Sequence, residues 1–218
     1  LKMYCGKMNQ DKFVENVLKG KRGGYFFEIC CSISEGFSPT LTLEGGHGWK
    51  GIMVGASTDF IDDIERQNRL NRICVIDNPL AIDYLRLFQQ NGVPHEIDYL
   101  EFDLDAHNSC AIRTLEKMDA EVLDMYKFAV VTFRHDLWIG DDVYTRQKSR
   151  EIFKKRGYFC VFEDVRFGKK HPTEDWYVHP DLVDMEYVSR LMELNSGGIF
   201  IFYKSIKYPK IEEYALVE

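Results

Sequence analysis

Two stretches of this sequence place charged side chains directly at the end of a hydrophobic run. FDLDAHN carries Asp103 and Asp105 at alternate positions, and TFRHDLW carries His135 next to Asp136. Alternating carboxylates can bind Mg²⁺ or Mn²⁺, because these cations take oxygen ligands. A histidine near carboxylates can act as a general base toward a hydroxyl, because its pKa lies close to neutrality. The two stretches therefore indicate metal-assisted chemistry or proton abstraction.

The elements around these stretches alternate between short hydrophobic runs and longer amphipathic segments. This alternation is typical of an α/β protein with a mainly parallel sheet. The last two hydrophobic runs lie too close together for a full helix between them, so we expect an antiparallel C-terminal hairpin on a seven-stranded Rossmann-like sheet. The expected strands are 25–29, 51–55, 72–76, 97–103, 128–133, 158–162 and 175–179, and the expected helices are 11–20, 81–92, 112–126, 145–157 and 181–195.

No linker, repeat or low-complexity tract divides the chain, so we expect one domain over 1–218. Its core is expected at about 23–195, preceded by the N-terminal helix 11–20 and followed by a tail at 196–218. In a doubly wound sheet the ligand binds beyond the carboxyl ends of the strands. Asp also caps helices and turns, so each polar residue there has a structural explanation alone, whereas the whole cluster indicates a site. The cluster comprises Glu28, the loop 30–38, Gly55, Asp77, Asp103, Asp105, His107, Arg134, His135 and Asp136.

The composition excludes several classes of function. The chain has 218 residues and a net charge of −7, which disfavours binding to nucleic acid through phosphate neutralisation. No apolar run approaches the roughly 20 residues that span a bilayer, so we expect no membrane partner. The six cysteines form no C-x-x-C pair and the histidines have no metal-ligand spacing, which indicates a reduced, cytoplasmic protein without a zinc site.

Six motifs, in order, carry a resemblance to a known family. They are GGYFFEI, TLTLEGGHGWKGIMV, IDYLEFDLD, YKFAVVTFRHD, TRQKSREIFKKRGYFCVFEDV and EDWYVHPDLVD. In these motifs the chain resembles the FkbM-type family of S-adenosylmethionine-dependent methyltransferases, from about Gly23 to Asp184. The resemblance implies a class I methyltransferase fold and O-methylation, often of a sugar or polyketide hydroxyl. The partner it implies is thus a small-molecule or glycan hydroxyl.

The resemblance also implies roles for individual residues. His135 would be the base, with Asp103 orienting cofactor or substrate and Asp136 beside them. Three positions depart from the family pattern: Cys30 replaces a glycine of the cofactor loop, Gly55 replaces an acid that binds both ribose hydroxyls, and Arg134 replaces an acid before the histidine. The implied cofactor residues are Glu28, Cys30, Ser32, Thr40, Gly55, Asp77 and Asp103.

Three functions are consistent with these residues. The first, which we favour, is an active methyltransferase that uses S-adenosylmethionine. The second is a catalytically silent methyltransferase-like domain that serves binding or assembly, in keeping with the replaced cofactor positions. The third is a glycosyltransferase in which Asp103 and Asp105 hold Mg²⁺ or Mn²⁺, a requirement that no other feature of the sequence supports. The sequence does not give the oligomeric state.

Overall fold

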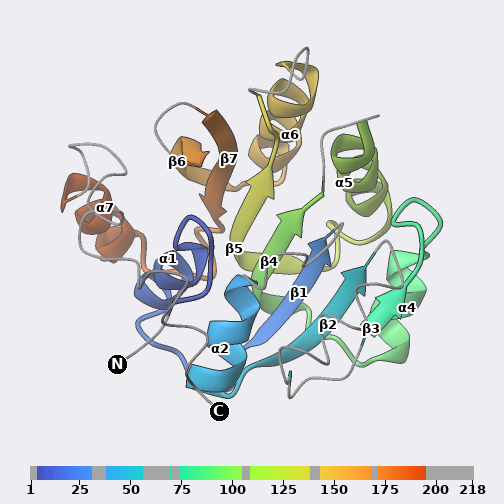
Figure 1. Ribbon diagram of the computed structural model, residues 1–218, viewed down its shortest axis with the longest axis horizontal. Coiled ribbons are helices and arrows are strands. Elements are labelled where there is room, and N and C mark those ends of the chain that lie inside the picture. Colours follow the sequence, from blue (N-terminus) through green and yellow to red (C-terminus); the bar gives the residue numbers. More distant parts are fainter. Residues whose placement is uncertain are drawn as a thin grey trace, which may run out of the picture.

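The computed structural model describes residues 4–30, 38–55, 69, 74–104, 109–137, 143–167 and 171–194. Within this part of the chain a seven-stranded sheet has the order β3-β2-β1-β4-β5-β7-β6 (Figure 1). Strands β1 to β5 are parallel, and β7 runs antiparallel to both β5 and β6. The predicted fold and its C-terminal hairpin are therefore confirmed. The strands are β1 (Tyr25–Cys30), β2 (Lys50–Gly55), β3 (Cys74–Ile76), β4 (Glu96–Asp103), β5 (Lys127–Arg134), β6 (Phe159–Phe167) and β7 (His171–Val178).

Helices cover both faces of the sheet. Figure 1 shows α4, α5 and α6 on one side and α1, α2 and α7 on the other. Helix α2 is absent from the helices expected from the sequence, because its threonines and paired glycines have low helix propensity. Pro39 at its first turn and Gly48 in the left-handed conformation at its end set its bounds. The helices are α1 (Gln10–Val17), α2 (Pro39–His47), α4 (Tyr84–Gln90), α5 (Cys110–Glu121), α6 (Val143–Lys155) and α7 (Met185–Leu194).

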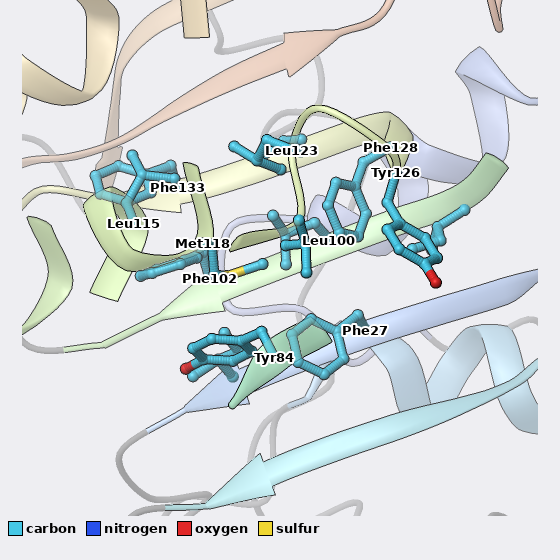
Figure 2. Close-up of a cluster of buried hydrophobic side chains, with 14 of the residues drawn as sticks. Phe27, Tyr84, Leu100, Phe102, Leu115, Met118, Leu123, Tyr126, Phe128 and Phe133 are labelled. Carbon is cyan, nitrogen blue, oxygen red and sulfur yellow. The ribbon is translucent and has the colours of Figure 1, made fainter. Parts of the chain in front are cut away.

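The face covered by α4, α5 and α6 is packed with hydrophobic side chains. Phe27 of β1 contacts Phe88 of α4 edge-on, with ring centroids 4.8 Å apart, and Phe133 of β5 packs against Phe153 of α6. Figure 2 shows Phe27 together with residues of β4, β5 and α5 in this cluster. Burial of each such large side chain contributes about 1.5–3 kcal/mol. This face therefore holds the sheet in register beneath the strand ends.

The opposite face, toward α1, α2 and α7, mixes hydrophobic and charged side chains. Phe13 of α1 stacks on Trp176 of β7 at 4.9 Å and fastens α1 to the sheet. Glu28, Glu101 and Glu174 lie buried in the strands of the same sheet. Charged groups are rarely buried without partners, so these side chains indicate a site on this side of the molecule.

Several further expectations can be compared with the structure. The predicted N-terminal helix 11–20 corresponds to α1, whereas the expected tail 196–218 lies outside the described residues. In the described part of the chain, Cys5, Cys30, Cys110 and Cys160 are free thiols, and the reduced state of the protein stays a prediction. Among the described residues, every helix is too short or too polar to cross a membrane.

Candidate functional site

The strand order reverses between β1 and β4, and this switch point brings the sequence-predicted strand ends together. Cys30, the last residue of β1, is the register partner of Gly55 at the end of β2 and of Asp103 at the end of β4. The end of β3 lies beside them, since the backbone N–H of Asp77 donates to the carbonyl of Gly55 at 3.2 Å. Ligands of doubly wound sheets bind at this position. Among the predicted cofactor residues, Ser32 lies outside the described part of the chain.

Glu28 lies two residues before the end of β1 and is almost completely buried. The hydroxyl of Ser38 donates to its Oε2 at 3.1 Å, the hydroxyl of Thr40 donates to the same oxygen, and an Arg69 nitrogen lies 3.7 Å away. Arg69 also donates from Nε to Glu44 at 2.7 Å. Glu28 and Thr40, both predicted cofactor residues, thus bind each other. This hydrogen bond fastens the start of α2 to strand β1.

Asp103 and Asp136 are joined by a single guanidinium group. Arg134 donates from Nη1 to Asp103 at 2.9 Å, and its Nε lies 2.7 Å from Oδ2 of Asp136. Burial alone would lower the pKa of Arg134, but the charges of Asp103 and Asp136 outweigh it and raise that pKa above its ordinary value. Arg134 therefore stays charged. Asp103 and Arg134 remain partly exposed, whereas Asp136 is completely buried.

His135 is completely buried and faces the β6–β7 hairpin. Its Nδ1 accepts a hydrogen bond from the backbone of Leu137 at 3.2 Å, so Nε2 carries the proton of the neutral ring. Nε2 faces Oδ1 of Asp175 at 3.5 Å and Oδ1 of Asp164 at 3.6 Å. Because both nitrogens face protein groups, this geometry gives His135 a positioning role between β5 and the β6–β7 hairpin.

His135, Asp164 and Asp175 bring potential metal ligands within 4.8 Å of one another, although the sequence predicted no metal at these positions. Two arginines already occupy their carboxylates. Arg146 binds both oxygens of Asp164, and Arg150 binds both oxygens of Asp175. Burial would raise the pKa of Asp175, but the hydrogen bonds from Arg150 and His135 outweigh it and lower that pKa. The positive charges balance the acids and would repel a cation, so the cluster is an ion-pair network that holds the hairpin.

Gln10, Glu101 and Glu174 lie in this region but were not among the predicted site residues. Gln10 of α1 donates to Oε1 of Glu174 at 3.0 Å, and the indole N–H of Trp176 donates to Oε2 at 2.7 Å. Burial and the charge of Asp103 raise the pKa of Glu174 to about 8, against the opposing effect of those two hydrogen bonds. Glu101 of β4 is also buried, and its pKa is raised well above the ordinary value by burial and by neighbouring acids.

A signal for these residues exists in the sequence. Glu101 and Asp103 alternate in the strand motif IDYLEFD, and Glu174 begins the motif EDWYVH. Side chains at alternate positions of a strand share one face, so a charge inside an otherwise hydrophobic strand points into the protein rather than to solvent. Gln10 carries no comparable signal. Its position follows only from the packing of α1 on the sheet.

Comparison with known proteins identifies the fold. No family model and no curated protein matches the chain. Among solved structures it is similar to the METTL16 MTase domain, with 11% identity, 82% of this chain and 68% of that chain covered, and a TM-score of 0.55. It is also similar to a methyltransferase from Pyrococcus furiosus, with 16% identity, 79% and 82% of the two chains covered, and a TM-score of 0.50. The chain therefore has the fold of the class I S-adenosylmethionine-dependent methyltransferases.

Proposed function

We propose that this protein is an S-adenosylmethionine-dependent methyltransferase of the FkbM type. The observation that carries the proposal is the pairing of Cys30 with Asp103 at the switch point of a class I sheet. S-adenosylmethionine supplies an electrophilic methyl group when bound. Its binding in such folds depends on the strand ends, which here converge from four neighbouring strands.

The residues at this edge fit the cofactor in part. Asp103 and Asp77 provide carboxylates at the ends of β4 and β3, where the cofactor's ammonium and adenosine groups require acceptors. Gly55 provides none at the end of β2. A missing pair of charge-assisted hydrogen bonds to the ribose reduces affinity by about 1.5–3 kcal/mol per bond. We therefore expect binding that is weaker than in a protein with an acid at this position.

The proposed acceptor is a hydroxyl of a sugar, glycan or other small molecule. Asp103 would accept a hydrogen bond from that hydroxyl, orient it and pass its proton to solvent as the oxygen takes the methyl group from the sulfonium, while Arg134 holds the partly exposed carboxylate in place. Methyl transfer depends chiefly on the alignment of the two reactants, so positioning by fixed side chains is the main requirement. His135 and Asp136, predicted as catalytic residues, are completely buried, and we propose that they position Arg134 and the β6–β7 hairpin.

A second function is favoured by the same departures, namely a methyltransferase-like domain that binds ligand without catalysis. Gly55 lacks the ribose acceptor, and His135 faces the β6–β7 hairpin. The glycosyltransferase alternative receives less support. Asp105 lies outside the described residues, and Asp103 accepts from Arg134, whose charge opposes a metal ion at this carboxylate.

The test is methyl transfer from labelled S-adenosylmethionine to a panel of sugars and polyols. Active protein should yield labelled methyl ether, and Asp103→Asn should lower the rate at least tenfold. Asp181→Asn is the matched control, because Asp181 pairs with Lys127 at the opposite end of β5 and is largely exposed. Bound cofactor without transfer to any acceptor would favour the silent domain. Equal rates for the two variants would refute the role of Asp103.

A further inference from the structure

Within the part of the chain that the structure describes, Glu101 and Glu174, two buried acids on the α1 side of the sheet, form no ion pair, although the charges of Arg69 and Arg134 act on them from a distance. Within the described residues, the nearby guanidinium groups bind other partners: Arg134 binds Asp103 and Asp136, whereas Arg69 pairs with Glu44 and Glu28 and donates to Thr40. Glu174 receives hydrogen bonds only from the neutral side chains of Gln10 and Trp176. Oε2 of Glu101 accepts no hydrogen bond within the described residues. A carboxyl group left in this state is costly unless it is protonated or meets a positive ligand.

Glu101 is buried near the strand ends with an oxygen atom that no group in the described part of the chain satisfies. Oε2 of Glu101 is buried and has no hydrogen-bond partner, and the whole residue is only 5% exposed. Glu101 is the register partner of Glu28 on β1 and lies two residues before Asp103 on the same face of β4. Glu174 of β7 is the register partner of Arg134, which binds Asp103. The carboxyl group of Glu101 therefore lies among acids from β1, β4 and β7, whose charges act on it.

We propose that Glu101 and Glu174 form a subsite for a protonated amine on the methyl acceptor. This inference rests on the proposed function and narrows its substrate class to amino sugars and related amino alcohols. An ammonium group donates up to three hydrogen bonds, which carboxylate oxygens accept strongly. The amine serves recognition, and the neighbouring hydroxyl oriented by Asp103 receives the methyl group.

An ammonium group fits these acids better than a metal ion does. Among the described residues, the group of His, Cys, Asp and Glu ligand atoms within 4.8 Å of one another is His135, Asp164 and Asp175. No three carboxylates around Glu101 come that close, so they cannot share the inner sphere of one cation. An ammonium group needs only two carboxylate oxygens, one on each side, because it donates from separate N–H bonds.

Binding of a cation between these acids has a measurable consequence. The charged groups facing Glu101 are Glu28, Asp103 and Glu174, which disfavour its ionisation, and Arg69, which favours it. A bound ammonium would favour the carboxylate form of both Glu101 and Glu174. Protons would therefore be released when the amine binds near neutral pH. The number released is obtained by calorimetry in buffers that differ in ionisation enthalpy.

The experiment titrates the protein at about pH 7 with two matched pairs of probes, glucosamine with glucose and ethanolamine with ethylene glycol. We expect each amine to bind at least tenfold more tightly than its neutral partner, with about one proton released. Glu101→Gln should weaken amine binding at least tenfold and reduce the proton release. The variant should fold, because it keeps the shape of the side chain and removes a buried acid, and circular dichroism checks this.

Equal binding of amine and neutral probes, no binding of either amine, or unchanged amine binding by Glu101→Gln would overturn the inference. Glu174→Gln provides a second variant with the same expectation. S-adenosylmethionine is titrated separately into each protein. Cofactor binding without amine binding overturns the subsite and leaves the proposed function standing. Amine binding with proton release but without cofactor binding supports the subsite and contradicts the proposed function.

Discussion

Glu174 makes the stability of this protein depend on pH, and one substitution removes this dependence. Its carboxyl group is buried, and its pKa is raised from 4.5 to about 8. The unfolded chain loses this proton near pH 4.5, whereas the folded protein keeps it until about pH 8. The stability contributed by protonated Glu174 is therefore complete below pH 4.5 and is lost as pH rises toward 8. Glu174→Gln removes this titration.

The size of the effect follows from the shift. Each pKa unit corresponds to about 1.4 kcal/mol, so a rise from 4.5 to about 8 corresponds to roughly 4–5 kcal/mol of stability between these pH values. The glutamine also has a cost. Gln10 and Trp176 both donate to Glu174, and an amide offers only one acceptor atom, so one hydrogen bond worth about 1 kcal/mol is lost at every pH.

Together, the titration of Glu174 and the lost hydrogen bond predict that the curves of unfolding free energy against pH cross for the variant and the wild type. Glu174→Gln should be about 1 kcal/mol less stable than the wild type near pH 4.5 and about 3 kcal/mol more stable near pH 8.5. The assay is urea unfolding followed by circular dichroism at half-unit pH intervals. Glu151→Gln is the control, because Glu151 is 68% exposed and pairs with Lys148 at the surface. That variant should keep the wild-type dependence on pH.

Parallel curves for Glu174→Gln and the wild type would refute the reasoning, since they would mean that Glu174 titrates alike in the folded and unfolded states. A variant that is less stable at every pH would show that the lost hydrogen bond outweighs the buried charge. A crossing at about pH 5–6 is the expected outcome.

Three further substitutions test the ion pairs and the cofactor edge. Arg134→Met leaves Asp136 buried without its cation and should destabilise the protein by about 3–5 kcal/mol in urea unfolding, with partial rescue by adding Asp136→Asn. Arg150→Met should lower the free energy of unfolding by about 3 kcal/mol at pH 7. The difference from the wild type should shrink below about pH 4, because ionised Asp175 stabilises the folded protein only above the pKa that this group has in the unfolded chain. A difference that does not depend on pH would contradict this. Gly55→Asp should tighten S-adenosylmethionine binding about 10–100-fold in calorimetry, with Gly55→Ala unchanged or weaker; equal affinities would mean that the ribose does not lie at the end of β2.

The sheet and its hairpin could be predicted from local patterns. Hydrophobic runs marked the parallel strands, because a strand covered on both faces is hydrophobic along its length. The short spacing before "DWYVH" marked the antiparallel pair β6 and β7. Helix α2 was missed because its residues favour other structures locally, and it is stabilised by tertiary contacts, namely packing of Leu43 on the sheet and the hydrogen bond of Thr40 to Glu28.

The grouping of the strand ends could be predicted from the fold, whereas the contacts of their side chains could not. The switch point follows from the fold, so Cys30 and Asp103 were placed correctly at neighbouring strand ends. The orientation of His135 depends on Asp164 and Asp175, which lie far along the chain in the hairpin. Asp164 also adopts a left-handed backbone conformation that no local motif indicates. Such contacts depend on tertiary packing.

The central claim is that the strand ends around Cys30 and Asp103 bind S-adenosylmethionine. Isothermal titration of the folded protein with S-adenosylmethionine and with S-adenosylhomocysteine tests it most directly. We predict saturable binding of both compounds with sub-millimolar affinity, weakened at least tenfold for both by Asp103→Asn, because both carry the ammonium group, and unaffected by Asp181→Asn. No detectable heat from either compound at millimolar concentration would contradict it.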